Sequence, residues 1–168
     1  MSTESQSQFK NILGDIPEKP SSAVAACLTW LSAITQGDMK TLDEVLDDNF
    51  VCTVLPLTIG VPVRKKQEWI KFIDGGFKKY YDFTFKVLQI VEGERHIVAH
   101  VTSDAKTITG GRYNNTYIFF WELTKPTQEG ERPKLVVLKE FMDSLYATGF
   151  FASERERAEA AGMVALED

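Results

Sequence analysis

The chain has few of the side chains that bind metals or form disulfide frameworks. Its 168 residues include two cysteines, Cys27 and Cys52, and two histidines. No cysteine–histidine cluster has the spacing of a metal site, so we expect no bound metal. Each cysteine lies among apolar residues. This favours buried, reduced thiols, while a disulfide between the two remains open.

Basic residues are also scarce. The chain has 19 Lys and Arg against 24 Asp and Glu, which gives a net charge of −5 at pH 7. A nucleic-acid interface needs clustered Lys and Arg to neutralise phosphates, so we expect no nucleic-acid partner. The pairs Lys65–Lys66 and Lys78–Lys79 are too small to reverse this balance. We interpret both pairs as solvated helix faces.

Long apolar runs and phosphate-binding loops are missing as well. No run approaches the roughly 18 residues of a membrane span, and residues 1–8 lack the apolar core of a signal peptide. We therefore expect a soluble, cytoplasmic protein with no membrane partner. The glycine pairs at 75–76 and 110–111 lack the strand–turn–helix context of a nucleotide loop, and no Gly-x-Ser-x-Gly elbow occurs. We expect no cofactor, which leaves acid–base work by side chains.

What the chain does contain is enough apolar sequence for one compact domain, since 43% of its residues are hydrophobic and 11% aromatic. Apolar residues at helical spacing predict three helices in the first half, over 21–37, 38–46 and 65–81. A short strand is predicted over 50–57. Residues 1–19 form a polar arm, and the charged stretch 153–161 predicts a helical tail that begins at Ser153.

The apolar period changes to two after residue 82, which predicts strands. These cover 83–87, 96–102, 113–123 and 134–147. Helices followed by an antiparallel meander are typical of the α+β class. The expected fold is a cone-shaped barrel in which three N-terminal helices pack on a curved antiparallel sheet. Polar side chains at 113–117 and 140–144 lie within aromatic strands and indicate a lined small-molecule cavity.

The order and spacing of several short motifs resemble the nuclear transport factor 2-like superfamily, in its SnoaL-like polyketide cyclase and ketosteroid isomerase branch. These motifs are a helix ending in Gly37–Asp38, Leu-Asp-Asp-Asn-Phe at 46–50, Pro62 before Trp69, Gly-x-Tyr-x-Asn-x-Tyr at 111–117, and Lys-Glu-Phe-Met-Asp at 139–143. The resemblance implies an N-terminal arm at 1–19, a SnoaL-like domain at 20–151 and a helical tail at 152–168. It also implies a homodimer and a substrate from natural-product metabolism, such as a polyketide or terpenoid.

Two carboxylates are candidates for acid–base catalysis. The resemblance places such a group at Asp143, which otherwise is a carboxylate at the sheet rim bonded to backbone. Glu140 lies three residues earlier, so in a regular strand it points to the opposite face. Only a bulge or twist lets both line one cavity, and Glu140 otherwise is an exposed strand residue paired with a lysine. A carboxyl desolvated in an aromatic pocket can have its pKa raised by roughly 3–5 units, which makes a general acid at neutral pH.

Further candidates lie on the strands and helices. His100 alternates with the apolar positions 97, 99 and 101, so it is a second proton carrier if its face is concave and a solvent or dimer residue if not. Tyr113, Asn115 and Tyr117 share a face and can hold a developing oxyanion, or else form an aromatic ladder. Trp30 and Trp69 on the helices are read either as core or as substrate-binding residues.

We therefore expect a cofactor-independent isomerase, cyclase or dehydratase acting on a small apolar molecule. The alternative is a non-catalytic protein that binds a hydrophobic ligand or acts as a dimeric adaptor. A third hypothesis, epoxide hydrolysis, needs an Asp-Arg-Asp arrangement. Asp104 and Asp143 are present, but we expect no arginine on the strands between them, which disfavours this chemistry.

Overall fold

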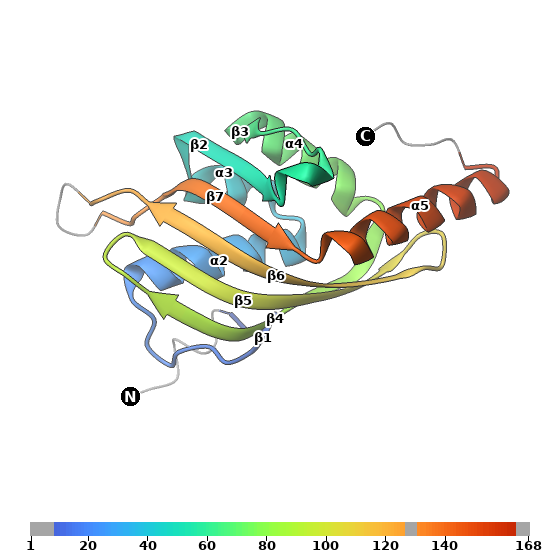
Figure 1. Cartoon of the computed structure of the whole chain (residues 1–168). Coiled ribbons are helices and arrows are strands. Elements are labelled where there is room, and N and C mark those ends of the chain that lie inside the picture. The colour runs from blue at the N-terminus through green and yellow to red at the C-terminus, as the bar shows by residue number, and fades with distance from the viewer. Residues whose placement is uncertain (1–8, 127–130, 164–168) are drawn as a thin grey trace.

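The computed structural model describes residues 9–126 and 131–163, and within them a curved sheet is covered on one face by helices (Figure 1). The strands are β1 (Ile12–Gly14), β2 (Leu46–Leu55), β3 (Arg64–Lys65), β4 (Tyr80–Glu92), β5 (His96–Thr107), β6 (Arg112–Leu123) and β7 (Leu135–Met142). The α-helices are α2 (Ser22–Gln36), α3 (Met39–Val45), α4 (Lys66–Phe77) and α5 (Ser144–Ala160), with a 3-10 turn, η1 (Leu57–Ile59). The predicted α+β class is confirmed.

The seven strands form one open sheet in the order β1-β4-β5-β6-β7-β2-β3. The run from β4 to β7 is antiparallel, as predicted, because consecutive strands there are joined by direct connections. The sheet as a whole is mixed, since β2 pairs with β7 and β1 with β4 in parallel. The expectation of a purely antiparallel sheet is therefore wrong at both of these pairings. Both involve strands from the N-terminal part of the chain, which reach the meander across intervening helices.

The first two predicted helices are confirmed, and their ends follow local chemistry. The Ser21 hydroxyl accepts a hydrogen bond from the backbone N–H of Val24 at 3.1 Å and begins α2. Gly37 ends this helix with a φ of 64°, a left-handed conformation that favours glycine. Asp38 then caps α3 by accepting from the N–H of Thr41. The apolar stripe of α2 is thereby held against the concave face of the sheet.

The C-terminal part of the chain differs from its prediction. The last strand ends at Met142 and not at residue 147, and α5 begins at Ser144, well before the expected tail helix. The reason is a cap, because the Asp143 carboxylate accepts from the N–H of Tyr146 at 3.0 Å. The described residues thus hold four α-helices where three helices and a tail were expected. The third helix is also shorter than predicted, since α4 ends at Phe77 and β4 begins at Tyr80.

The core lies between α2 and the inner face of the sheet. On β5, the alternate residues Ile97, Ala99 and Val101 are buried, and on β6 the buried set runs through Phe119 and Trp121. The predicted arm contributes Phe9 and Ile12 to this core. Ile12 is the first residue of β1, which pairs with β4, the first strand of the meander. Residues 1–8 of the arm and 164–168 of the tail lie outside the described residues.

Candidate active site

Glu140 is a carboxyl group placed on the inner face of the sheet. It sits on β7 between Leu138, which is fully buried, and Met142, which packs against the core. Its register partner on β6 is the buried Phe119. Alternation along the strand therefore turns Glu140 inward, as the two-residue period predicts.

The Glu140 carboxyl forms no hydrogen bond or ion pair with any of the residues that the structure describes, so its charged form is not compensated. Desolvation raises its pKa from the usual 4.5 to about 7. The side chain is nevertheless only half-buried, so protein atoms do not fill the space around it completely. A desolvated carboxyl that keeps part of its surface accessible can be reached by a small molecule.

Two phenols share this inner face with Glu140. Burial raises the pKa of Tyr113 to about 12 and also raises the pKa of Tyr117 well above its usual value, and in both cases the charge of Glu140 adds to the increase. The Tyr117 hydroxyl donates to the Tyr113 oxygen at 3.0 Å, and the Asn115 side-chain amide donates to the same oxygen at 3.0 Å. The three residues predicted to hold an oxyanion are thus brought into one buried network.

A cluster of aromatic rings forms the wall between α2, α4 and β6. Trp30 stacks on Trp69 with ring centroids 5.6 Å apart, and it meets Phe119 and Trp121 edge-on at 5.2 and 5.6 Å. The indole N–H groups of Trp30 and Trp121 have no hydrogen-bond acceptor among the described residues. Because both indoles are essentially fully buried, they serve first as core. Their rings pack the interior between the helices and the concave face of the sheet.

The helix α5 covers the end of the inner face at Tyr113. The rings of Phe150, Tyr146 and Phe151 lie 4.9, 5.9 and 5.7 Å from the Tyr113 ring. The Tyr146 hydroxyl accepts from the backbone N–H of Asn114 at 3.1 Å and donates to the Arg112 carbonyl at 3.3 Å. The Tyr146 hydroxyl therefore forms hydrogen bonds with backbone groups in the part of β6 that does not pair with β7.

A polar contact fastens the far end of α5. Glu154 accepts from the Thr109 hydroxyl in the β5–β6 turn and from Arg157 on its own helix. Figure 1 shows α5 continuing the line of β7 toward this turn. The helix is therefore held at both ends of its contact with β6, and Tyr113 is enclosed by it.

The other two predicted catalytic residues do not join Glu140. Asp143 is exposed, and its carboxylate caps α5. His100 lies on the outer face, where its Nε2 is 3.0 Å from the Thr116 hydroxyl. The buried residues of β5 are those that alternate with His100, so the concave side is the apolar one. The question that the sequence left open about this face is thereby answered.

The expectation about arginine is wrong. Arg112 is the first residue of β6, and its guanidinium donates two hydrogen bonds, of 2.8 and 2.7 Å, to Asp104. These bonds lower the pKa of the Asp104 carboxyl. Both side chains lie on the outer face, as alternation from the buried Ala105 and Tyr113 requires. The structure therefore pairs an Asp with an Arg but places the pair on the opposite side of the sheet from Glu140.

Sequence reasoning missed Ser103 and Tyr146 as parts of this site. Ser103 is buried on β5, and its hydroxyl lies 3.1 Å from the Tyr117 hydroxyl. The available signal was a lone hydroxyl at an otherwise apolar alternate position. Tyr146 had no such signal, because its role depends on a helix that the pattern placed later in the chain.

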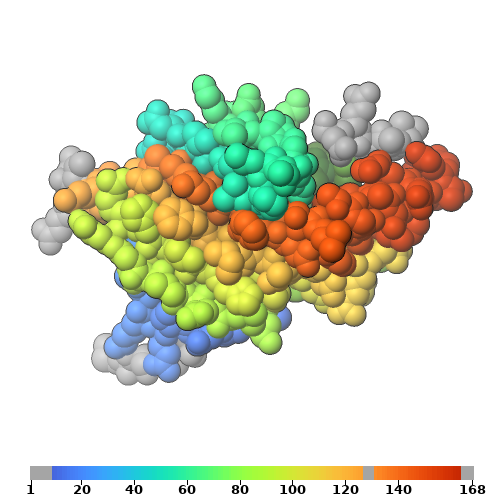
Figure 2. Space-filling model, viewed as in Figure 1, coloured from blue at the N-terminus to red at the C-terminus, as the bar shows by residue number. Residues whose placement is uncertain are grey.

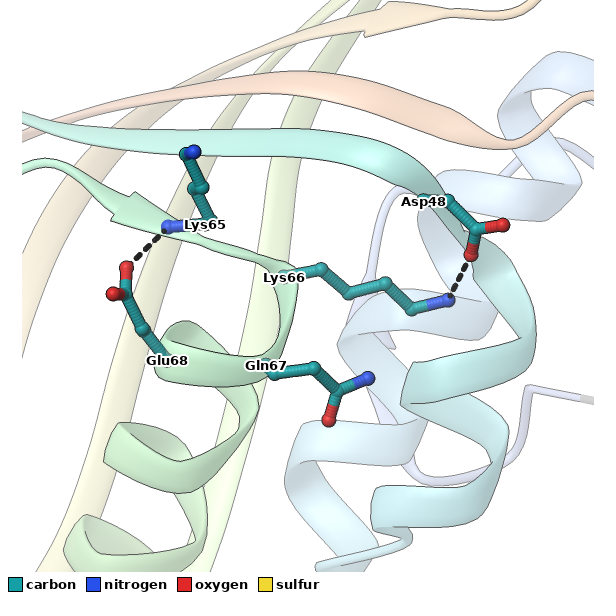
Figure 3. Close-up of a pocket in the computed structure, with 5 residues that line it drawn as sticks. All are labelled: Asp48, Lys65, Lys66, Gln67 and Glu68. Atoms are coloured by element: carbon teal, nitrogen blue, oxygen red, sulfur yellow. Dashed lines mark hydrogen bonds and ion pairs between the residues drawn. The ribbon is translucent and has the colours of Figure 1, made fainter.

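A hollow lies on the surface at the start of α4 (Figure 3). The Lys66 amine is buried there and donates to the Leu46 carbonyl at 3.1 Å and to Asp48 at 3.2 Å, with Asp43 at 3.3 Å. The backbone N–H of Lys65 donates to Glu68 in a capping interaction. The charge of Lys66 is satisfied within the chain, and its contacts tie α4 to the α3–β2 junction. We assign it a structural role.

Both cysteines are free and buried, which confirms the favoured interpretation of two reduced thiols. Desolvation by burial raises the pKa of the Cys52 thiol. Over residues 9–126 and 131–163, no three His, Cys, Asp or Glu side chains are grouped so that they could hold a metal ion. In the same residues, no helix has the length and apolar character needed to cross a membrane.

Helices packed on the concave side of a curved, open sheet, with a desolvated carboxyl among aromatic residues, define an α+β cone fold with an inward-facing polar site. The SnoaL-like domain family matches residues 28–126, and the chain belongs to this family, within the nuclear transport factor 2-like superfamily. The predicted family is confirmed. None of the curated proteins matches the chain.

Solved structures confirm the cone fold. BvnE pinacolase from Penicillium brevicompactum is 20% identical with a TM-score of 0.70, and the match covers 84% of this chain and 96% of that one. PrhC from Penicillium brasilianum is 16% identical with a TM-score of 0.70, covering 84% and 90%. A Mycobacterium tuberculosis epoxide hydrolase of the LEH-like type is 15% identical with a TM-score of 0.61, covering 84% and 96%.

Proposed function

We propose that this protein is a cofactor-independent acid–base enzyme, an isomerase, cyclase or dehydratase, that acts on a small apolar molecule. The observation that carries the proposal is Glu140, an inward carboxyl without a partner in the described chain and with a pKa raised to about 7. A group with this pKa is present in both protonation states at neutral pH. It can therefore take a proton from one atom of a substrate and return it to another.

The hydroxyl network supplies the second part of the proposed mechanism. Removing a proton next to a carbonyl, or opening a ring at oxygen, places negative charge on an oxygen atom. Donors already oriented toward that oxygen stabilise the charge without reorganising. Tyr113 lies on the same face as Glu140 and can act as such a donor, and Tyr117 and Asn115 hold it in place through the hydrogen bonds that they donate to its oxygen. His100 and Asp143 lie elsewhere and have no part in this mechanism.

The proposed substrate is apolar because the wall around the carboxyl is aromatic. Glu140 pairs across the sheet with Phe119, which packs edge-on against Trp30, and no charged partner accompanies Glu140 among the described residues. The fold similarity to a pinacolase and to an epoxide hydrolase supports an enzymatic role, as does membership in the SnoaL-like family. A place in natural-product metabolism remains part of the proposal and rests on the resemblance to polyketide cyclases.

The test is proton exchange on a simple probe. Cyclohexanone in D2O exchanges its α-hydrogens, and NMR follows the rate. We expect the wild-type protein to accelerate exchange and Glu140→Gln to reduce that acceleration by roughly 10²–10⁴-fold, the usual contribution of a positioned general base. Glu94→Gln, in the exposed β4–β5 turn, is the matched control. Equal acceleration by wild type and Glu140→Gln contradicts the proposal.

A non-catalytic ligand-binding protein is the second candidate. The observation that favours it is the near-complete burial of Trp30 and Trp121, whose rings pack against each other in the interior. A pure binding protein should hold cyclohexanone without accelerating its exchange. Saturation-transfer NMR on the same samples separates the two functions, because it detects binding independently of proton exchange.

We also propose a homodimer formed through the outer face of the sheet. No described helix covers this face in Figure 2, where side chains of β4 to β7 are visible. Ile118 and Phe141 are register partners on it and are 41% and 51% exposed, and Val91 is 55% exposed. Apolar residues clustered at the centre of a sheet suit a two-fold contact. Ile118→Lys should convert a dimer to a monomer in light scattering, whereas Leu13→Lys should not.

A further inference from the structure

The buried hydroxyl groups of the site form a chain that crosses two strands. Ser103 of β5 meets Tyr117 of β6 at 3.1 Å, and Tyr117 meets Tyr113 at 3.0 Å. All three residues are at most 6% exposed. A buried hydroxyl needs a partner for its hydrogen, so the direction of each bond determines where an unused hydrogen remains.

The Asn115 amide sets the direction at one end. Its Oδ1 accepts from the backbone N–H of Thr116 at 2.7 Å, so its Nδ2 must be the atom that faces Tyr113. This bond fixes the amide orientation, which is otherwise ambiguous. The Tyr113 oxygen therefore accepts a hydrogen from Asn115.

The remaining bonds run the same way. Tyr117 donates its hydrogen to the Tyr113 oxygen, so the Tyr117 oxygen is free to accept from Ser103. The Ser103 oxygen in turn accepts from the backbone N–H of Asn115 at 3.4 Å. With two accepted bonds, the Tyr113 oxygen is saturated as an acceptor. Its own hydrogen has no acceptor among the described residues.

We infer that Tyr113 is the phenol that donates its hydrogen to the substrate, and that Ser103 and Tyr117 are positioning residues that orient and polarise it. This inference rests on the proposed function and assigns roles within the same site. It requires that the substrate carry a carbonyl, hydroxyl or ether oxygen that can accept from Tyr113. A purely hydrocarbon ligand does not satisfy the site.

The direction of the chain has a chemical consequence. Each bond donated toward Tyr113 increases the acidity of its hydrogen, which strengthens the bond to an oxygen that becomes negative. The Tyr113 ring is held by the rings of α5, with Phe150 closest at 4.9 Å. Tyr113 is therefore held in place both by the hydrogen bonds to its oxygen and by the aromatic rings that pack against its own ring.

The test is the carbonyl stretch of cyclohexanone labelled with ¹³C at its carbonyl, measured by difference infrared spectroscopy. We expect a band shifted to lower frequency in the wild-type protein, because a donated hydrogen bond weakens the C=O bond. Tyr113→Phe removes one hydroxyl and should abolish the shift. Ser103→Ala and Tyr117→Phe leave Tyr113 in place and should each reduce the shift, while Ser103→Thr should restore it.

Two further variants separate this inference from the proposed function. Glu140→Gln should keep the shifted band while losing proton exchange. If the wild-type protein shows the shifted band but does not accelerate exchange, the result counts against the proposed function and not against this inference. Thr102 lies on the outer face of β5 beside Ser103, so Thr102→Val should leave the band unchanged. A wild-type band at the solution frequency, or an unchanged shift in Tyr113→Phe, overturns the assignment of Tyr113. An unchanged shift in both Ser103→Ala and Tyr117→Phe overturns their positioning role.

Discussion

Glu140 and Asp143 lie only three residues apart, but their carboxylates are in different structural positions. The first turns inward from β7 and meets the core, whereas the second stands just beyond the strand and accepts the N–H of Tyr146 at 3.0 Å to begin α5. Strand alternation sends side chains an odd number of residues apart to opposite faces. Only one of the two carboxylates is therefore available to a ligand on the concave side.

The raised pKa of Glu140 predicts a stability that depends on pH. Since the folded-state pKa is about 7 and the ordinary value 4.5, the folded protein holds this proton more tightly than the unfolded chain does. Its contribution is complete below pH 4.5 and is lost as the pH rises through 7. Glu140→Gln should therefore gain stability relative to wild type between pH 4.5 and 8, by up to about 3 kcal/mol. Urea unfolding across this range measures the difference, and a constant difference contradicts the assigned environment.

The cap at Asp143 predicts a local effect on stability. Asp143→Ala removes the acceptor for the N–H of Tyr146 and should destabilise the fold by about 1 kcal/mol, while Asp143→Asn should cost less because asparagine also caps helices. Chemical unfolding followed by circular dichroism measures both. Asp74→Ala, on α4 and away from its first turn, is the control. If the alanine variant is as stable as wild type, the cap contributes nothing to the fold.

The Tyr146 hydroxyl predicts how α5 is held. Tyr146→Phe keeps the ring contacts with Tyr113 and Phe150 but loses the bonds to β6. The expected cost is about 1 kcal/mol. Hydrogen exchange should accelerate specifically at the amide of Asn114, which donates to that hydroxyl. Tyr81→Phe, at an exposed phenol, is the matched control. Unchanged protection at Asn114 argues against this docking role.

Burial of both cysteines predicts slow thiol chemistry. Desolvation raises the pKa of Cys27 and of Cys52, so little thiolate forms near neutral pH. The native protein should react with Ellman's reagent only at the rate at which it opens, and two thiols should react at once in urea. Fast reaction of one thiol in the native protein contradicts the packing described for it.

Much of the fold follows from local patterns. Helix α2 could be predicted between Ser21 and Gly37 because a cap, an apolar stripe and a left-handed glycine all agree. The alternation on β5 and β6 identified the two faces of each strand, since its period is set by the backbone alone. The parallel pairing of β2 with β7 could not be predicted, because no local pattern reports a contact between strands some 80 residues apart.

The sequence identified several residues of the site but not how all of them are placed relative to one another. Tyr113, Asn115 and Tyr117 share a face by spacing alone, and the structure brings them together. The inclusion of Ser103 depends on the register between β5 and β6, which pairs it with Asn115. Arg112 was overlooked because the predicted strand began one residue later.

The sequence by itself determined the α+β class and the alternation of faces along each strand, because periodicity acts over a few residues. It left open which of Glu140 and Asp143 lines the concave side. Only the tertiary structure decided that the apolar face is the concave one and that His100 lies outside. It alone decided that Glu140 is desolvated, since the pKa of a carboxyl depends on what surrounds it in space. Those surroundings include the neighbouring strands β2 and β6, whose residues Val54 and Phe119 pair with Glu140 and lie far from it along the chain.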